Sequence, residues 1–319
     1  MSDEAVKKFQ TYLFFLRHFD LLVRQTRDDD TVETLVSGLL EEQHPLLANI
    51  QPKALTPARL AILRRMMFNA WNSETVARIN SLFAVDVRVI TNQWKPVQVY
   101  YALYFLLAGV HELYAPGQRR GHEATLRFAT NTISYLFPHP WRCYYDFDSG
   151  DCHRFAWQST PQVASGWNLA NHPDANVFVV HFYRTTGTEK RYERWLENGK
   201  KKKHRLGHER SGKAIRIKDI NGGTIGFWDV LWRMRKWVNY KEAQALLEGQ
   251  QFLPHVEEFD SCLNSILTAS AAVVEHVLYT LIGDEQMTEM YDSYLAVTSG
   301  KVDCSALQVR RDVLCGLPF

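Results

Sequence analysis

Apolar residues recur at helical spacing along most of the chain. Near the start, Phe9, Leu13 and Leu16 are three or four positions apart, which places their side chains on one face of a helix. The same spacing predicts helices over residues 4–27, 31–42, 56–72, 72–83, 97–114, 122–136, 226–240 and 252–282. The segment 285–319 predicts one further helix and a tail that packs back. The pattern therefore predicts a mainly α fold.

Local signals indicate where some of these helices begin and which are buried. Thr56 followed by Pro57 combines a capping hydroxyl with a proline in the first helical turn. Asn72, Ser73 and Glu74 predict a break and a new helix start. Residues 97–114 are apolar nearly all round, which is typical of a buried helix. The aromatic stripe of this helix is expected in the core and consists of Tyr100, Tyr101, Tyr104 and Phe105.

The pattern changes after Pro138. Residues 176–183 (NVFVVHFY) are rich in β-branched and aromatic side chains and predict the clearest strand, and residues 214–218 (AIRIK) predict a second. Residues 86–91 (DVRVIT) are too few to distinguish a strand from a helix. These changes predict three parts: an N-terminal helical region (1–92), a helical bundle (93–137 and 222–319) and a β-containing basic insertion (138–221).

Positive charge is concentrated in one part of the insertion. Residues 190–218 contain 12 Lys or Arg and three acidic residues, although the net charge of the chain is only +2. Such a cluster is typical of an electrostatic footprint for nucleic acid, with Tyr192, Trp195 and His204 available to stack on bases. A solvated loop is the alternative. The predicted nucleic-acid-binding residues here are Lys200, Lys201, Lys202, Lys203, Arg205 and Arg210.

The helix predicted over residues 226–240 (GFWDVLWRMRKWVNY) is apolar on one side and basic on or near the other. Arg235 and Asn239 are four positions apart and therefore share a helical face. This face predicts contacts with phosphates or bases, and a solvated helix face is the alternative. Arg233, Arg235 and Asn239 are therefore added to the predicted nucleic-acid-binding residues.

The cysteines and the apolar runs bear on the compartment. Five widely spaced cysteines, an odd number, favour reduced thiols over a disulfide framework. The N-terminus lacks the apolar core of an export signal. No apolar run approaches the ~20 residues needed to cross a bilayer. The sequence therefore predicts a cytoplasmic protein with no membrane partner.

Motifs for metal binding and catalysis are weak. Residue types that suit zinc occur close together, at His139, Cys143, Cys152 and His153. Their spacing matches no usual zinc knuckle. Three acids in one loop, Asp146, Asp148 and Asp151, leave open a metal-dependent phosphodiester cleavage. No glycine-rich phosphate loop occurs, so the sequence predicts neither a bound metal nor a cofactor.

Three short motifs follow one another in a suggestive order. Tyr100-Tyr101-Ala102 lies on one predicted core helix, Gly121-His122 begins the next, and Arg235 and Tyr240 lie on a third. This order resembles the HEPN superfamily, small helical bundles found in toxin–antitoxin pairs, CRISPR effectors and other prokaryotic defence proteins. The resemblance covers two blocks, 95–137 and 226–285. It implies a helical bundle, interrupted here by the insertion, in which His122 faces the same groove as Arg235.

The resemblance also implies a site and partners. HEPN ribonucleases carry an arginine followed four to six residues later by a histidine, use the pair across a dimer interface, and cleave RNA without a metal ion. Here Tyr240 stands in the place of the histidine. A phenol with a pKa near ~10 is a poor base at neutral pH. The resemblance thus implies Arg235 and Tyr240 as catalytic positions and a homodimer, but the tyrosine argues against ordinary ribonuclease activity.

These features give two expected functions from different classes. The first is nucleic-acid binding, RNA rather than DNA, in a prokaryotic defence or stress system, with divergent ribonuclease activity as an extension. The second is a scaffold or regulatory subunit that binds a partner protein and has no catalytic activity. Charge removal at residues 200–203 would weaken binding and flatten its salt dependence in the first case only.

Overall fold

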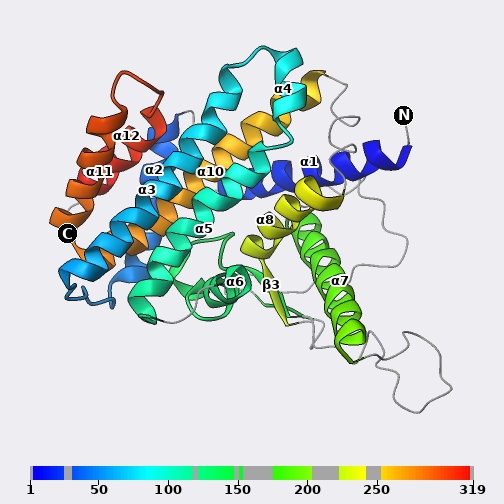
Figure 1. The fold of residues 1–319 in the computed structure, drawn as a ribbon, viewed down its shortest axis with the longest axis horizontal. Helices are drawn as coiled ribbons and strands as arrows, with labels where there is room; N and C mark the ends of the chain where they lie inside the picture. The colour runs from blue at the N-terminus through cyan, green and yellow to red at the C-terminus, as the bar shows by residue number, and fades with distance from the viewer. Residues whose placement is uncertain are drawn as a thin grey trace.

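The computed structural model describes residues 3–24, 31–117, 121–146, 151–153, 175–202, 223–241 and 253–316. The prediction of a mainly α fold is confirmed (Figure 1). The elements in chain order are α1 (Asp3–Arg24), α2 (Val32–Leu47), α3 (Pro57–Ile79), η1 (Asn80–Leu82), α4 (Val85–Thr91), α5 (Lys95–Tyr114), α6 (His122–Asn131), η2 (Ser134–Leu136), β1 (Tyr144–Asp146), β2 (Asp151–His153), α7 (Ala175–Lys202), β3 (Thr224–Gly226), α8 (Phe227–Lys236), η6 (Trp237–Lys241), α10 (Leu253–Ile282), α11 (Asp284–Thr298) and α12 (Ser305–Gly316).

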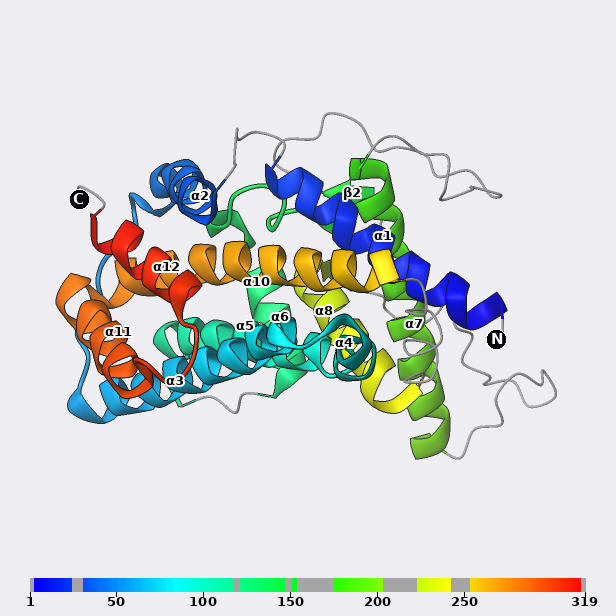
Figure 2. The ribbon, with the colours of Figure 1, turned by 90° about the horizontal axis from the view of Figure 1, so that it is seen from above.

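The long helix α10 forms the centre of the fold (Figure 2). Helices α3 and α5 pack on one side of it, and α1, α2 and α12 pack on the other. Small residues such as Ala269 and Ala272 are fully buried on α10, and they let its neighbours approach closely. Among the described residues, α10 is also the one helix long and apolar enough to cross a membrane, and most of that stretch is buried inside the protein.

Helix α3 confirms one predicted start and corrects another. Thr56 accepts a hydrogen bond from the Arg59 backbone N–H at 3.4 Å, so it caps α3 as predicted. The predicted restart at residues 72–74 is wrong, because α3 continues to Ile79. Tertiary partners satisfy the polar side chains there: Asn72 accepts a hydrogen bond from the Tyr294 hydroxyl at 3.1 Å, and Glu74 turns inward. The undecided residues 86–91 lie in helix α4.

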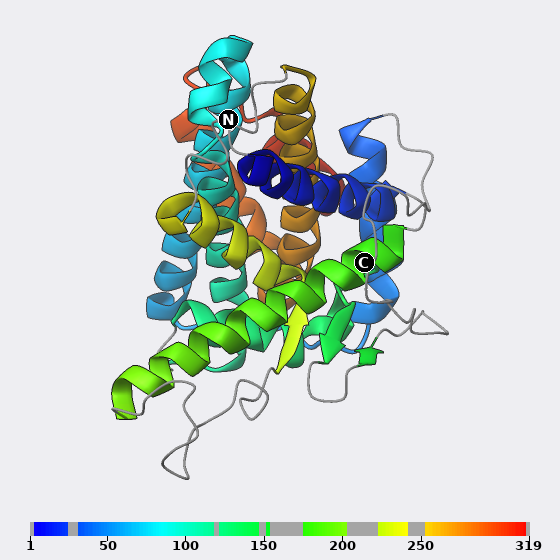
Figure 3. The same cartoon turned by 90° about the vertical axis from the view of Figure 1, so that its right-hand side faces the viewer.

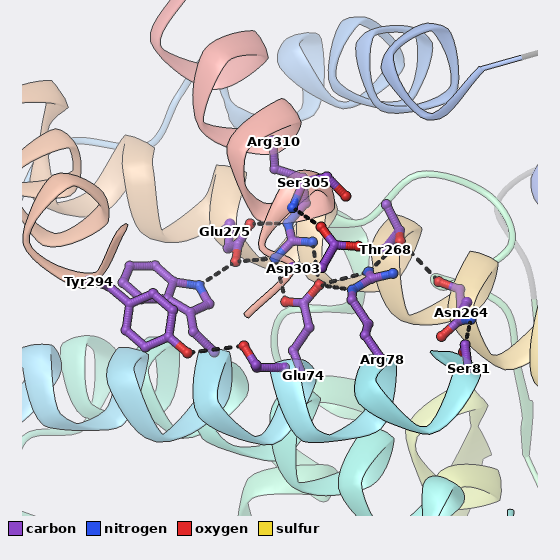
Figure 4. A network of polar contacts seen from close by, with 12 residues as sticks. Glu74, Arg78, Ser81, Asn264, Thr268, Glu275, Tyr294, Asp303, Ser305 and Arg310 are labelled. Atoms are coloured by element: carbon purple, nitrogen blue, oxygen red, sulfur yellow. Dashed lines mark hydrogen bonds and ion pairs between the residues drawn. The ribbon is translucent and has the colours of Figure 1, made fainter. Parts of the chain in front are cut away.

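A buried charge network ties α3, α10 and α12 together (Figure 4). The Arg310 side chain is fully buried and donates to both oxygens of Glu74, at 2.8 and 2.6 Å, and to Glu275 at 2.7 Å. Trp71 and Tyr291 each donate to Glu275 at 2.8 Å. We call these five residues the Arg310 cluster. Burial acts to raise the pKa of Glu74, but Arg310 and Arg78 together lower it to about 2, so Glu74 is charged at neutral pH.

The prediction of a strand over residues 176–183 is wrong, because this segment lies in helix α7. Its apolar side chains pack on α1: the Phe182 ring lies 4.6 Å from the Phe15 ring, and Phe178 stacks on His18 at 4.6 Å between ring centroids. A continuous apolar run fits a buried helix as well as a buried strand. Because Phe178 and Phe182 are buried in the main core, this part of the predicted insertion is integral to the bundle.

The β-structure is a small antiparallel sheet with strand order β2-β1-β3. Tyr145 of β1 pairs with Cys152 of β2 on one side and with Ile225 of β3 on the other. Strand β3 leads directly into α8, so the sheet joins the predicted insertion to the bundle. The strand predicted at 214–218 lies outside the described residues. The prediction of a single helix after residue 285 is also wrong, because α11 and α12 both form.

Candidate anion-binding site

Helix α8 is held between α5, α6 and α7 (Figure 3). Asp229 in its first turn accepts a hydrogen bond from the Gly226 backbone N–H at 2.9 Å and forms a buried ion pair with Lys190 of α7. Trp228, Val230 and Leu231 are buried beside it. This anchoring fixes the direction of α8 and therefore the positions of the basic residues in its last turn.

Two of the three basic residues in that last turn are neutralised by α7. Arg233 forms an ion pair with Glu189 at 2.6 Å and donates hydrogen bonds to Thr185 and Thr186 at 2.9 and 3.0 Å. Lys236 pairs with Glu193 at 2.6 Å. The structure therefore uses Arg233, one of the predicted nucleic-acid contacts, to hold α7 and α8 together.

Arg235 points the other way, toward α5. Its guanidinium carbon lies 5.2 Å from the centre of the Tyr100 ring and 5.1 Å from that of Tyr101, within the range of cation–π attraction. No carboxylate among the described residues pairs with it, and its Nε has no hydrogen-bond partner there. Arg235 is thus a half-buried cation on an aromatic surface, without a neutralising acid.

His122, the first residue of α6, completes this group. Its Nδ1 lies 2.7 Å from the Tyr100 hydroxyl, and its ring packs 4.3 Å from the Tyr104 ring. His122 and Arg235 therefore both lie against Tyr100. Burial and the charge of Arg235 both lower the pKa of His122, so the ring is neutral at neutral pH. We call Arg235, His122, Tyr100, Tyr101 and Tyr104 the Arg235 cluster.

The hydrogen bond between Tyr100 and His122 has a definite direction. Burial raises the pKa of Tyr100 far above its ordinary value, so the phenol keeps its proton. The oxygen also lies near Arg235, which can only donate. We therefore infer that the Tyr100 O–H donates to Nδ1, which leaves the proton of the neutral ring on Nε2. His122 then offers an N–H donor, and Nε2 has no partner among the described residues.

The backbone changes helical type just after Arg235. Residues Trp237–Lys241 form a π-helical segment, η6, a feature that often accompanies functional sites. Asn239 lies in it, half-buried, and its Oδ1 has no hydrogen-bond donor among the described residues. Tyr240, which the resemblance implied as catalytic, is in the same segment. Its backbone is described here, but no contact of its side chain is.

The first part of the lysine-rich segment is helical and is therefore not the solvated loop that was the alternative interpretation. Lys200, Lys201 and Lys202 are the last residues of helix α7. They therefore follow the exposed Tyr192 and the half-buried Trp195, whose rings lie 5.6 Å apart on the same helix. Lys203, Arg205 and Arg210 lie outside the described residues, so the structure does not place them relative to the Arg235 cluster.

Metal-binding residues do not gather in the part of the chain that the structure describes. No group of three or more His, Cys, Asp or Glu side chains there has a geometry that could hold a metal ion. Cys143, from the zinc candidate, is buried in the core. The side chains of Cys152 and His153 lie outside this description.

Comparison with known proteins gives no assignment. The sequence matched no protein-family model, and searches of curated proteins and of solved structures found no similar protein. The HEPN resemblance therefore stays a prediction, and the function has to be argued from the geometry of the chain itself.

The sequence singled out Arg235, and it placed His122 near Arg235 only through the resemblance. It assigned the aromatic stripe of α5 entirely to the core, whereas only Tyr100 is fully buried. Tyr101, beside the guanidinium, and Tyr104, beside His122, are half-buried. It treated His122 mainly as a helix-start residue. The available signal was that no acid lies three or four positions from Arg235 in the sequence, so no acid on its own helical face could pair with it.

Proposed function

We propose that this protein binds single-stranded RNA and that the Arg235 cluster holds one of its phosphates. The observation that carries the proposal is Arg235 itself, a half-buried guanidinium next to a neutral His122 and without a carboxylate partner. Arginine and an imidazole N–H are both donors to phosphate oxygens. Two donors that both lie against Tyr100, from α6 and α8, suit an anion.

Aromatic side chains near these donors favour a single strand over a duplex. Tyr101 and Tyr104 are half-buried at the cluster, and Tyr192 with Trp195 offers a second aromatic pair on α7. Unpaired bases stack on such rings, whereas bases inside a duplex cannot. The three lysines that end α7 extend the positive charge beyond this second pair.

The choice of RNA over DNA belongs to the proposal. The Asn239 side-chain oxygen has no donor among the described residues, but it is buried, so it does not by itself distinguish a ribose 2′-hydroxyl from deoxyribose. A role in prokaryotic defence, which the resemblance implies, stays a prediction.

The test is a binding titration by fluorescence anisotropy with single-stranded RNA, single-stranded DNA and duplex RNA of matched length. Arg235→Gln is expected to weaken single-stranded RNA binding about tenfold, the effect of one charge-assisted hydrogen bond. It should also reduce the salt slope by about 0.7. Arg64→Gln is the matched control, because Arg64 is a partly exposed arginine that pairs with Glu289 between α3 and α11. An unchanged affinity in Arg235→Gln would refute the proposal.

A second variant tests whether the RNA-binding surface extends beyond the Arg235 cluster. It replaces four lysines together with glutamine: Lys200, Lys201, Lys202 and Lys203. The salt slope is expected to fall by about three, because four cations each contribute about 0.7 for a single strand. A slope that stays at the wild-type value would remove these lysines from the binding surface while leaving the role of Arg235 intact.

The same mixtures, incubated with Mg²⁺ or with EDTA, separate binding from cleavage. Because the Tyr100 hydroxyl occupies Nδ1 and the proton sits on Nε2, His122 has no free lone pair to act as a general base. We therefore expect binding without RNA decay. Decay that survives EDTA and disappears in Arg235→Gln would replace this proposal with the metal-free ribonuclease activity that the resemblance implies.

A specific observation favours a second role, self-association. Five of the 11 exposed large apolar side chains among the described residues fall between positions 82 and 94: Leu82, Phe83, Val87, Ile90 and Trp94. Helix α4, in the middle of this patch, buries none of its residues. Patches of this kind mark interaction sites.

We propose a second copy of the chain as the occupant of this patch. Arg88 is turned toward α10, where it lies 3.8 Å from both Glu257 and Asp260. Of the two charged side chains of α4, Asp86 is therefore the exposed one, and the rest of the patch is apolar. Sedimentation velocity over a range of concentrations should show a dimer that Ile90→Ser with Trp94→Ser abolishes. Val297→Ser, an exposed apolar change on α11, is the control. A protein that stays monomeric at all concentrations would refute this role.

A further inference from the structure

A polar cavity of about 470 Å³ lies among α6, α7, α8 and the β1–β3 edge of the sheet. Its walls carry three cations and three carboxylates, namely Arg127, Lys190, Arg194, Glu123, Asp146 and Asp229. Ligand pockets in proteins commonly measure about 300–1,000 Å³. A hollow with so many charged side chains suits a small, highly polar ligand and does not suit an apolar one.

Two arginines converge on a single point beside this cavity. Arg127 of α6 and Arg194 of α7 each donate to the same oxygen, Oε1 of Glu123, at 2.9 Å. The Glu123 side chain is 62% exposed, so it can swing into solvent without leaving a buried charge. A pair of guanidinium groups that meets at one oxygen has the geometry with which proteins hold phosphate.

The wall of the cavity formed by α7 and α8 is rigid. Lys190 is only 9% exposed and forms an ion pair with Asp229. Asp229 is itself fixed by a hydrogen bond from the Gly226 backbone N–H at 2.9 Å. Asp146 and Asn131 add acceptor oxygens to the lining. Such acceptors suit hydroxyl groups on a ligand, because a hydroxyl can donate to a carboxylate or amide oxygen.

We propose that this cavity binds a ribose phosphate group, with Arg127 and Arg194 on the phosphate and the carboxylate and amide oxygens of the lining on the sugar hydroxyls. In this arrangement Glu123 occupies the phosphate position when no ligand is present, and it leaves when the ligand binds. The ligand is either a free mononucleotide or the terminal nucleotide of an RNA strand, since both present the same group.

A second, smaller hollow lies beside this cavity. It shares Glu123, Lys190 and Arg194 with the first and is also lined by Trp232 and Lys236. His122 and Glu123 are consecutive, so the Arg235 cluster and the cavity adjoin at the start of α6. The terminal-nucleotide form of the proposal rests on the proposed RNA binding, whereas the free-mononucleotide form stands without it.

Isothermal titration calorimetry with the full chain tests the free form. AMP and ribose 5-phosphate are expected to bind, and adenosine, which lacks the phosphate, at least tenfold more weakly. Arg127→Gln and Arg194→Gln should each weaken AMP binding about tenfold, and Arg64→Gln should leave it unchanged. Glu123→Gln should strengthen AMP binding, because it removes the negative charge that competes for both arginines. A purely structural role for Glu123 predicts no such gain.

Oligoribonucleotides with and without a terminal phosphate test the second form. The phosphorylated strand should bind more tightly than its hydroxyl-ended twin, and this ratio should persist in Arg235→Gln and vanish in Arg194→Gln. The proposal is overturned if AMP and ribose 5-phosphate fail to bind and the two strands bind equally. RNA binding that depends on Arg235 could still be observed in that case. The experiment therefore tests the cavity proposal separately from the proposed RNA binding.

Discussion

Arg310 and Arg235 are both arginines on helices, and both lie near aromatic side chains. They differ in whether a carboxylate neutralises them. Arg310 is fully buried between Glu74 and Glu275, and its donors reach carboxylate oxygens at 2.6–2.8 Å. Arg235 is half-buried on Tyr100 and Tyr101 and has no carboxylate partner among the described residues. Arg310 is neutralised inside the fold, whereas Arg235 is available to an anionic ligand.

The difference separates charges that hold the fold from charges that meet a ligand. A buried charge without a partner costs several kcal/mol, so a core accepts charges only in neutralised groups. A half-buried arginine on aromatic rings costs much less, because cation–π contact and solvent both stabilise it. Burial together with pairing, rather than residue type, therefore indicates which basic residues of this chain are available to an anion.

The largest expected effect is in the Arg310 cluster. Arg310→Met leaves Glu275 buried without its cation and leaves Glu74 with Arg78 alone, and the free energy of unfolding should fall by about 3–5 kcal/mol. Urea denaturation at neutral pH measures it. The double change Arg310→Met with Glu275→Gln removes one charge of each sign, keeps an acceptor for Trp71 and Tyr291, and leaves Glu74 paired with Arg78 at 2.7 Å. It should therefore cost less than the single change. If the combined change lowered the free energy of unfolding more than Arg310→Met alone, the unpaired charge would not be the cause of the loss.

The next effect is an acid sensitivity at His276 on α10. This side chain is fully buried, its Nδ1 lies 3.2 Å from Gln43 Oε1, and its Nε2 has no partner among the described residues. Burial, and then the nearby His44, lower its pKa from 6.5 to about 3. The unfolded chain therefore binds the proton first, so the contribution of His276 is fully present above pH 6.5 and is lost as the pH falls toward 3.

Urea denaturation at pH 7 and pH 5 tests this prediction. The free energy of unfolding should fall by about 2 kcal/mol from this group over that range. His276→Gln keeps a donor for Gln43 and cannot be protonated, so its pH dependence should be shallower by that amount. An equally steep fall in the variant would show that other groups cause the acid sensitivity.

A smaller effect on stability is expected at Arg235. Arg235→Gln loses a cation–π contact at a half-buried site, so the free energy of unfolding should change by less than about 1 kcal/mol. The same variant should lose RNA binding as described above. If urea denaturation showed that the free energy of unfolding falls by more than about 3 kcal/mol, Arg235 would be a structural cation like Arg310. The distinction between the two arginines would then be wrong.

The smallest effect is expected at the surface ion pair of Arg64 and Glu289. Their side chains are 39% and 58% exposed, and exposed pairs contribute about 0–1 kcal/mol. Arg64→Gln and Glu289→Gln should each leave the urea midpoint close to that of the wild type. A cost that approached that of Arg310→Met would mean that pairing matters here irrespective of burial.

Much of the helical architecture could be predicted, and the errors have identifiable causes. The cap at Thr56 and the apolar run of α5 depend on neighbouring residues alone, so local signals were sufficient. The break expected at residues 72–74 failed because Asn72 and Glu74 receive their partners from α11 and α12, far along the chain. The strand expected over 176–183 failed because a short apolar run does not reveal whether a helix or a sheet will cover it.

By itself, the sequence determined that this protein is mainly helical, that α5 is buried, and that positive charge gathers near the end of α7 and on α8. These properties follow from the order of apolar and charged residues over one or two helical turns. Only the tertiary structure decided that Arg233 and Lys236 are neutralised by α7 while Arg235 meets His122 and Tyr100. That choice depends on which acids face each side of α8, and those acids come from other helices that only folding brings together.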